Sequence, residues 1–339
     1  MHSLLLAVAL LALPALALAQ GSLTPAGAPA PTMRTLAQIE PRVPLQAGAP
    51  SVAAEANGGF TITAPGSYYL TSSIAVASGN AITITCNDVT LDLNGFTLSS
   101  TAYPPAGTGI ELSLNLTHVT IRNGHISGSL YLSSAGTAGP GFDRGIYAWG
   151  MLLNDIVVED VTVQSVASAG IDLTTLTNVA KTTIARRCSV STSGGRGIEA
   201  TQVIDCAADN CRGDAIASRI VLNSYGSSLS GYGIGAATVE TSYGRSNTGG
   251  GITAGSVGNS YGYCYGDARV YPETGYGITA EVATNSYGGT YSGKAAIKAT
   301  GTASFCYGDY PGHPAITGMH AFACVASGMI GTTNQEYCH

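Results

Sequence analysis

The segment "VLNSYGSSLSGYGIGAATVETSYGRSNTGGGI", residues 221–252, repeats its own pattern. Ser-Tyr-Gly occurs in it at 224–226 and 242–244, and Gly-Ile occurs at 233–234 and 251–252. The offset is 18 residues in both cases. A short fixed period of this kind indicates a solenoid, in which each repeat forms one coil that stacks on the next.

The isoleucine of this repeat can be followed through most of the chain. Several steps are 18 residues, and the others are 18 or 19 residues plus an insertion. Apolar residues alternate in each unit, as in "GIEA" (197–200) and "GITA" (251–254), which is the period of a strand. The pattern predicts an all-β, single-stranded parallel β-helix with coils of about 18 residues, stacked about 4.8 Å apart. The members of the column are Ile110, Ile146, Ile171, Ile198, Ile216, Ile234, Ile252, Ile278, Ile297 and Ile316.

The hand of the predicted β-helix follows from the residues around Ile234. A left-handed β-helix also uses 18 residues per coil, but it places an aliphatic residue at every sixth position. The residues six before and six after Ile234 are Ser228 and Glu240. Because this hexapeptide pattern fails, we expect the right-handed form.

A second column consists of small residues, which suit a narrow core. Since strand residues alternate, the residue after each small one should point outward, and in five coils it is a tyrosine. Rings in adjacent coils could stack, at about 0.5–1.5 kcal/mol per pair. The same row could instead contact sugar rings, so two interpretations stay open. The inward column is Cys188, Cys206, Ser224, Ser242, Ser260, Ser286, Cys306 and Cys324, and the outward one includes Tyr225, Tyr243, Tyr261, Tyr287 and Tyr307.

The outward residues that follow the isoleucines form another row, which begins with Glu111, Tyr147, Asp172 and Glu199. Asp172 and Glu199 fall in adjacent coils, so their Cβ atoms should lie about 5 Å apart. Two close carboxylates raise one pKa, and they could act as acid and nucleophile or bind Ca²⁺. Carboxylates on exposed strands can equally be solvated residues without a role.

Arginines and insertions flank this acidic row. Arg144 and Arg196 each stand two residues before their isoleucine and could neutralise an acidic sugar. Insertions at 99–108, 127–143 and about 263–274 precede Gly-Ile strands, so they should overhang one edge of the row and could form the wall of a cleft. The insertion 127–143 leads directly into Arg144 and is expected to lie over the row.

Five stretches resemble exported right-handed parallel β-helix repeat proteins of environmental bacteria, a class that shares the pectate-lyase architecture. The resemblance covers residues 33–325 and implies the fold, while relatives by fold include polysaccharide lyases and glycoside hydrolases. The stretches are "LAQIEPRVPL" (36–45), "PGSYYLTSSI" (65–74), "VTLDLNGFTL" (89–98), "VTIRNGHISG" (119–128) and "DCAADNCRGDAIAS" (205–218).

The catalytic motifs of those relatives are not reproduced. The Gly-His-Gly and paired-Asp motifs of β-helix polygalacturonases are absent, and "NGHI" (123–126) matches only in part. The Ca²⁺-binding Asp cluster and catalytic Arg of pectate lyases cannot be matched residue by residue. Asp92, Arg122 and His125 could have a functional role, or they could be solvated strand residues and turn formers, and we favour the second interpretation.

The N-terminus is typical of an exported protein. An apolar run, Leu4–Leu18, is followed by Ala19 in an A-x-A cleavage pattern, which predicts a signal peptide at 1–19. A linker and N-terminal segment at 20–50 then precede a β-helix with terminal caps at 51–339. We expect a secreted, periplasmic or cell-surface monomer, and no later stretch of the sequence is apolar and long enough to cross a bilayer.

Charge and cysteine spacing exclude other classes. The net charge of −6 leaves no basic footprint for nucleic acid. None of the eight cysteines lies in a C-x-x-C pair, so no zinc site is indicated and no cofactor is expected beyond the Ca²⁺ alternative. In-register inward side chains rarely reach the dihedral angle of a disulfide. We therefore predict free, buried thiols at Cys188, Cys206, Cys306 and Cys324.

Two functions remain open. The first is a non-catalytic β-solenoid, structural or carbohydrate-contacting, with the tyrosine column as the contact surface. The second is a polysaccharide lyase or glycoside hydrolase acting on an acidic polysaccharide, with Asp172, Glu199 and Arg196 as catalytic candidates and Glu111, Tyr147 and Arg144 as binding candidates. A cleft with converging carboxylates and a basic group would favour the enzyme, and a flat, open row would favour the first function.

Overall fold

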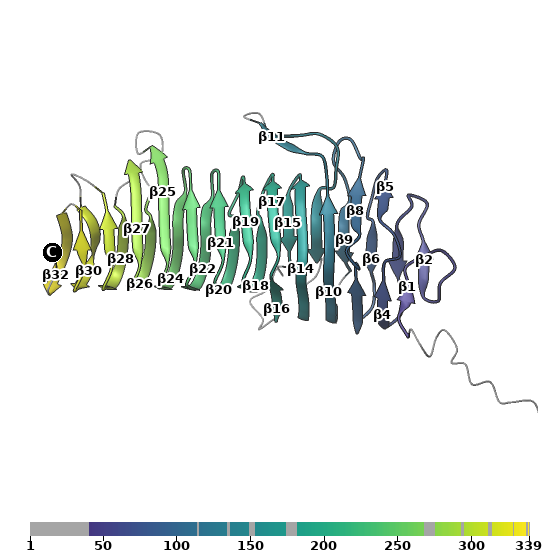
Figure 1. Cartoon of the computed structure of the whole chain (residues 1–339). Helices are drawn as coiled ribbons and strands as arrows, with labels where there is room; N and C mark the ends of the chain where they lie inside the picture. Colours follow the sequence, from purple (N-terminus) through teal and green to yellow (C-terminus); the bar gives the residue numbers. More distant parts are fainter. Residues whose placement is uncertain are drawn as a thin grey trace, which may run out of the picture. The chain divides into compact units, whose positions relative to one another are not determined.

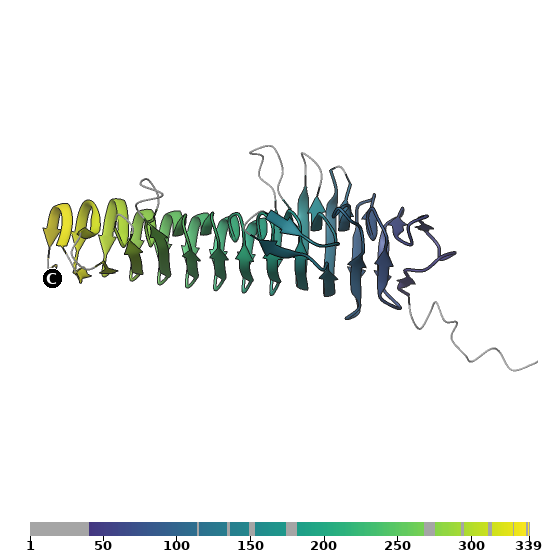
Figure 2. The same cartoon turned by 90° about the horizontal axis from the view of Figure 1, so that it is seen from above.

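The computed structural model describes residues 41–339 except 114, 134–135, 149–152, 174–181, 268–274, 293–294, 311–313, 328, 337 and 339. The predicted signal peptide and residues 20–40 of the predicted linker lie outside the described residues. From Arg42 onward the chain forms one compact unit, in which every regular element of the described part is a strand. The strands pair in parallel from coil to coil, so the predicted parallel β-helix is confirmed (Figure 1, Figure 2).

Three faces of parallel strands enclose the core, and we name them A, B and C in the order in which each coil forms them. Face A carries the isoleucine column. Its strands are β3 (Phe60–Ile62), β6 (Ile82–Ile84), β9 (Thr108–Leu112), β13 (Arg144–Ala148), β15 (Ala169–Asp172), β18 (Ile198–Ile204), β20 (Ile216–Leu222), β22 (Tyr232–Glu240), β24 (Gly250–Gly258), β26 (Ile278–Thr284), β28 (Ile297–Ser304), β30 (Pro314–Phe322) and β32 (Met329–Glu336).

Face B follows face A in each coil. From β18 onward it is formed by the second half of the same long strand that begins on face A. In the earlier coils its strands are β1 (Val43–Pro44), β4 (Gly66–Tyr69), β7 (Val89–Asp92), the first half of β10 (Thr117–Ser127), the first half of β14 (Asn154–Val166) and β16 (Thr183–Arg186).

Face C carries the tyrosine column and completes the coil. Its strands are β5 (Ile74–Val76), β8 (Thr97–Ser100), the second halves of β10 and β14, β17 (Ser189–Ser193), β19 (Ala207–Cys211), β21 (Tyr225–Ser228), β23 (Tyr243–Ser246), β25 (Tyr261–Asp267), β27 (Tyr287–Ser292), β29 (Tyr307–Asp309) and β31 (Val325–Ala326).

Two additions interrupt this plan. β2 (Val52–Ala54) runs antiparallel to β3 at the N-terminal end of the described solenoid. β11 (Tyr131–Ser133) and β12 (Gly136–Ala138) form an antiparallel hairpin within the predicted insertion 127–143. The hairpin projects beside the coils that follow it in sequence (Figure 1).

The repeated Ser-Tyr-Gly and Gly-Ile motifs meet across the core. Ile234 is completely buried on face A, and Gly226 faces it from face C. A Cβ atom on Gly226 would lie 3.0 Å from Ile234 Cγ1 and 2.1 Å from the Gly233 carbonyl oxygen. The core is so thin here that only glycine fits opposite the isoleucine. In the preceding coil the same column holds Ala208.

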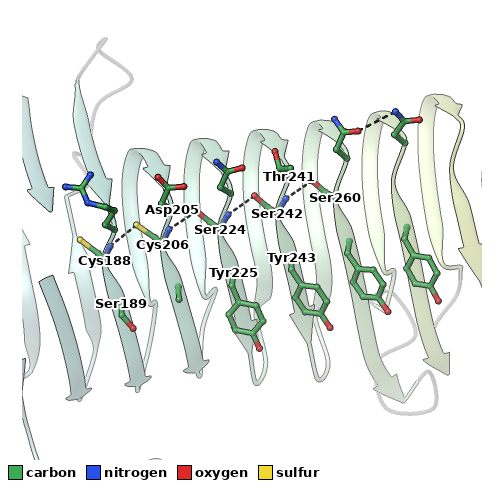
Figure 3. A pocket seen from close by; sticks show the side chains of 17 residues that line it. Cys188, Ser189, Asp205, Cys206, Ser224, Tyr225, Thr241, Ser242, Tyr243 and Ser260 are labelled. Atoms are coloured by element: carbon green, nitrogen blue, oxygen red, sulfur yellow. Dashed lines mark hydrogen bonds between the residues drawn. The ribbon is translucent and has the colours of Figure 1, made fainter. Parts of the chain in front are cut away.

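The column of small residues forms a hydrogen-bonded ladder along the core wall (Figure 3). From Cys188 to Ser260, each backbone N–H donates to the side chain of the next coil, for example Ser224 N to Ser242 Oγ at 3.1 Å and Ser242 N to Ser260 Oγ at 3.2 Å. Each hydroxyl in turn donates to a carbonyl two residues earlier, as Ser242 Oγ does to Glu240 O at 2.7 Å. The ladder therefore satisfies amides that turn away from the strand pairing at this corner.

The residue before each ladder position turns the chain from face B to face C with a positive φ. Asn and Asp adopt this left-handed conformation most easily among residues that carry a Cβ atom. We call the outward row that they form the corner row. It consists of Arg187 (φ 51), Asp205 (φ 54), Asn223 (φ 49), Thr241 (φ 50), Asn259 (φ 48), Asn285 (φ 48), Phe305 (φ 53) and Ala323 (φ 49).

We expect Thr241→Asn to stabilise the protein. A β-branched residue is strained at a φ of 50°, and asparagine relieves much of that strain. The free energy of unfolding should rise by about 1 kcal/mol, measured by chemical denaturation. The control is Thr253→Asn on face A, where no positive φ occurs and asparagine suits a strand poorly. An equal gain in both variants would contradict the strain at the corner.

The predicted free thiols are confirmed. Cys188, Cys206, Cys306 and Cys324 are buried and unbridged. Their sulfur atoms lie close to carbonyl groups: Cys206 Sγ lies 3.2 Å from Ile204 O, and Cys324 Sγ lies 3.4 Å from Phe322 O. The thiols thus contact the carbonyl group two residues earlier, as the serine hydroxyls of the ladder do.

Candidate functional site

The tyrosine column has the predicted register. Tyr225 pairs with Tyr243, Tyr243 with Tyr261, Tyr261 with Tyr287, and Tyr287 with Tyr307 on face C. The ring centroids of these successive pairs lie 5.4, 4.8, 4.4 and 5.2 Å apart, with interplanar angles of 16°, 5°, 3° and 13°. These values are those of offset-stacked rings, so the packing interpretation of the column holds.

Stacking restricts what the column can offer to a ligand. Tyr243, Tyr261 and Tyr287 each have a neighbouring ring against both faces. Their edges and hydroxyl groups are therefore the parts most available to solvent. The Tyr287 hydroxyl donates to Asp309 Oδ2 at 3.0 Å, and burial followed by this hydrogen bond raises the pKa of Tyr287.

A shallow groove of about 810 Å³ runs along the solenoid between the corner row and the tyrosines (Figure 3). The small residues of the ladder form its floor, and the two outward rows form its walls. It is open to solvent along its length. Its lining is Arg187, Cys188, Ser189, Asp205, Cys206, Ala207, Asn223, Ser224, Tyr225, Thr241, Ser242, Tyr243, Asn259, Ser260, Tyr261, Asn285 and Tyr287.

The wall formed by the corner row is polar and partly linked. Asn259 Nδ2 donates to Glu240 Oε2 at 3.2 Å, and Asn285 Nδ2 donates to Asn259 Oδ1 at 3.4 Å. Each amide keeps further donor and acceptor capacity, since an asparagine side chain offers two N–H groups and one carbonyl oxygen. The floor hydroxyls already donate and accept within the ladder, so the walls carry the available polar groups.

The acidic row on face A also has the predicted register. Tyr147 pairs with Glu111 in one neighbouring coil and with Asp172 in the other, and Asp172 pairs with Glu199. The Asn80 side chain donates a short hydrogen bond to Glu111 Oε2. The row is therefore a real alignment of outward groups on adjacent coils.

Arg196 lies beside the acids of this row, as expected. Its Nη1 is 2.5 Å from Glu199 Oε2, and its Nε is 4.0 Å from Asp214 Oδ2. Burial raises the pKa of Glu199 and outweighs the opposing effect of Arg196, while the charge of Asp172 adds to the rise. A carboxyl with a raised pKa beside a second carboxylate is one element of an acid catalyst.

Arg144 has a different environment. Its Nη1 lies 3.3 Å from Asp143 Oδ2, and its guanidinium carbon lies 4.3 Å from the centre of the Tyr147 ring. The cation–π contact holds the guanidinium over Tyr147.

The hairpin β11–β12 does not cover the acidic row, so that prediction is wrong. Side chains of 130–133 line a separate groove of about 560 Å³ with Thr192, Asn210 and Leu229, which belong to face C and the corner after it. A Cβ on Gly136 would lie 3.7 Å from the guanidinium of Arg212. The hairpin follows the solenoid along this corner, away from the outward side of face A.

Neither a metal centre nor a spanning helix is present in the described residues. No three His, Cys, Asp or Glu side chains among them are grouped so that they could hold a metal ion. No helix in this part of the chain is long and apolar enough to cross a membrane.

We expect Glu199→Gln to alter the pH dependence of stability. Because burial raises the pKa of Glu199, the folded protein keeps this proton to a higher pH than the unfolded chain does. As the pH rises from the ordinary pKa of glutamate through the raised one, ionisation of Glu199 lowers the free energy of unfolding of the wild type. Glutamine does not ionise, so the variant does not lose this stability. In thermal denaturation across this pH range, the melting temperature of the variant should rise relative to that of the wild type as the pH increases. A difference in melting temperature that stays constant, or that moves in favour of the wild type, would contradict the raised pKa of Glu199.

The corner row was missed by the sequence interpretation. Its signal was present: Asn223, Asn259 and Asn285 each stand directly before a ladder serine, and Asp205 stands before a ladder cysteine. Asn and Asp at a fixed point of the repeat indicate a left-handed turn. The tyrosines form one wall of the groove, and the corner row forms the other wall, across the ladder from them.

Comparisons of the chain with protein-family models, with curated proteins and with solved structures return no match.

Proposed function

We propose that the protein is an exported, non-catalytic β-solenoid that contacts a polysaccharide through the groove between the corner row and the tyrosines. The apolar run at Leu4–Leu18 and the resemblance to exported bacterial β-helix repeat proteins support export to the periplasm, the cell surface or the medium. We expect the protein to act as a monomer.

The groove is the observation that carries this proposal. Over the four coils from Asn223 to Asn285 it repeats the same wall groups, an amide or hydroxyl on one side and a phenol on the other. A repeating surface suits a repeating polymer, because each coil can offer the same contact to the next unit of the ligand. Sugar-binding sites combine aromatic carbons with fixed hydrogen-bonding groups, and both are present here.

An acidic-polysaccharide hydrolase or lyase is the second candidate, and Glu199 supports it. The raised pKa of Glu199 and the register with Asp172 would suit an acid and its partner. Against this, Arg196 pairs directly with Glu199, and neither of the two grooves described above is lined by Glu111, Asp172 or Glu199.

A glycan array with parallel detection of reaction products distinguishes the two functions. The groove variant is Asn223→Gly with Asn259→Gly, which removes two amides but keeps the left-handed backbone. The row variant is Asp172→Asn with Glu199→Gln. We expect the wild type to bind glycans without releasing products, the groove variant to lose binding, and the row variant to keep it.

Two results would contradict the proposal. Products that the wild type releases and the row variant does not would establish the enzyme instead. Absence of binding to every glycan on the array would remove the carbohydrate-contacting function.

A further inference from the structure

We infer that the groove selects a neutral, extended polysaccharide whose chain runs along the solenoid axis. This inference rests on the proposed function and adds the charge class of the ligand and its direction. Three features of the groove support it: its charges, the state of its hydrogen-bonding groups, and its repeat.

The described lining of the groove offers no spare cation to an acidic polymer. Arg187 is the one basic residue among the described residues that line it, and the Arg187 guanidinium binds Asp160 through two hydrogen bonds of 2.8 Å and Glu159 at 3.2 Å. Asp205 lines the groove in the next coil, and Glu240 contacts the Asn259 wall amide. An acidic chain would therefore meet paired arginine and nearby carboxylates, on a protein with a net charge of −6.

The available polar groups are of the kind that neutral hydroxyls bind. Asn223, Asn259 and Asn285 can each donate and accept, and a sugar hydroxyl does the same. In the described part of the chain the Asn223 side chain makes no hydrogen bond, so it can bind a ligand without first losing a partner. Below these residues the ladder hydroxyls are already engaged and can only form the floor.

The tyrosine wall contributes edges and hydroxyl groups. Because Tyr243 and Tyr261 stack at 4.8 Å and 5°, a sugar cannot insert between the two rings. The rings cannot act as separate stacking platforms, and a ligand that lies across several ring edges is favoured over one that stacks on a single face.

The repeat sets the direction and the useful length of the ligand. Corner-row residues line the groove from Arg187 to Asn285, which spans five coil steps. At about 4.8 Å per step this is about 24 Å along the axis. An oligosaccharide aligned with the axis gains contacts with every coil that it crosses, and the gain ends where the groove ends.

Calorimetric titration with two oligosaccharide series tests the inference. One series is neutral β-1,4-glucan oligomers, from disaccharide to octasaccharide, and the other is oligogalacturonates of the same lengths, both at low and high salt. We expect affinity for the neutral series to increase with length, then to level off, and to change little with salt. The oligogalacturonates should bind at least about tenfold more weakly at low salt.

The groove variant Asn223→Gly with Asn259→Gly should weaken binding of the long neutral oligomers by about tenfold. Its control is Asn115→Gly with Asn210→Gly. These two asparagines also have a positive φ, 59° and 54°, and they lie outside the groove lining. The control variant should bind like the wild type, and thermal denaturation shows whether both variants remain folded.

Each other outcome overturns a defined part of the inference. Tighter binding of the oligogalacturonates, lost in the groove variant, would overturn the neutral class but leave the proposed function. Neutral binding that the groove variant keeps would overturn the location. Binding of neither series, together with no binding on the glycan array, would overturn both the inference and the proposed function.

Discussion

Replacing Gly244 with valine is expected to lower the free energy of unfolding by about 3 kcal/mol. Gly244 is buried on the inward side of face C, directly opposite the Gly251–Ile252 segment of face A. A Cβ atom there would be 2.3 Å from the Gly251 carbonyl oxygen and 2.7 Å from Ile252 Cγ1. The first of these contacts is with backbone, which cannot move aside as a flexible side chain can. The loss should be visible as a lower midpoint in chemical denaturation followed by circular dichroism.

The same substitution at Gly235 provides the control. Gly235 lies on face A, and a Cβ atom there would meet nothing within 4 Å. Valine suits a partly exposed strand position, so Gly235→Val should change stability by no more than about 0.5 kcal/mol. If the two variants are equally stable, the core is not as thin as the Gly226 and Gly244 contacts indicate.

Replacing Asp92 with alanine should cost about 2 kcal/mol. Asp92 is only 7% exposed at the end of β7. Its carboxylate accepts from the backbone N–H of Asn94 at 2.9 Å and from the Asn123 side chain at 3.2 Å, and it pairs with Arg42 at 3.5 Å and Arg122 at 3.2 Å. One side chain therefore joins four groups from three coils of face B.

The cost at Asp92 arises from these lost partners, so an acid with a single weak partner should behave differently. Asp209 on face C is exposed and lies 3.9 Å from Arg245 Nη2. Asp209→Ala should change stability by less than about 0.5 kcal/mol in the same denaturation experiment. Equal losses at Asp92 and Asp209 would argue against an anchoring role for Asp92.

Periodicity in the sequence predicts the parts of this fold that repeat. Once the coil length is known, the alignment of Ile234 with Ile252 and of Tyr225 with Tyr243 follows from counting, and both pairs have that register. The pairing of Asp172 with Glu199 was predicted in the same way, across an insertion, because the Gly-Ile motif marks the start of each strand.

Features that do not repeat could not be obtained by counting. The path of β11–β12 depends on contacts of its own side chains with face C, such as the groove shared with Asn210. The partner of Arg144 is its neighbour Asp143, with Tyr147 beneath the guanidinium, and no spacing rule ranks these partners against Asp172. Side-chain direction on an exposed surface depends on such local competition.

The interpretation of Asp92 shows the same limit. In the sequence it is an alternating, outward position of a strand, and such a residue is usually exposed. In the structure it is buried, and Arg42, from a segment far earlier in the chain, pairs with its carboxylate. A contact between one residue of the repeat and one residue before the repeat leaves no periodic signal.

The tyrosine stack gives this protein an internal optical probe. Light absorbed by one phenol can pass to the next when rings lie parallel at 4.4–5.4 Å, as they do from Tyr225 to Tyr307. The folded chain should therefore emit depolarised tyrosine fluorescence and show exciton coupling in near-ultraviolet circular dichroism. Both signals depend on neighbouring coils that remain in register. They would report the separation of these coils during unfolding, without any label.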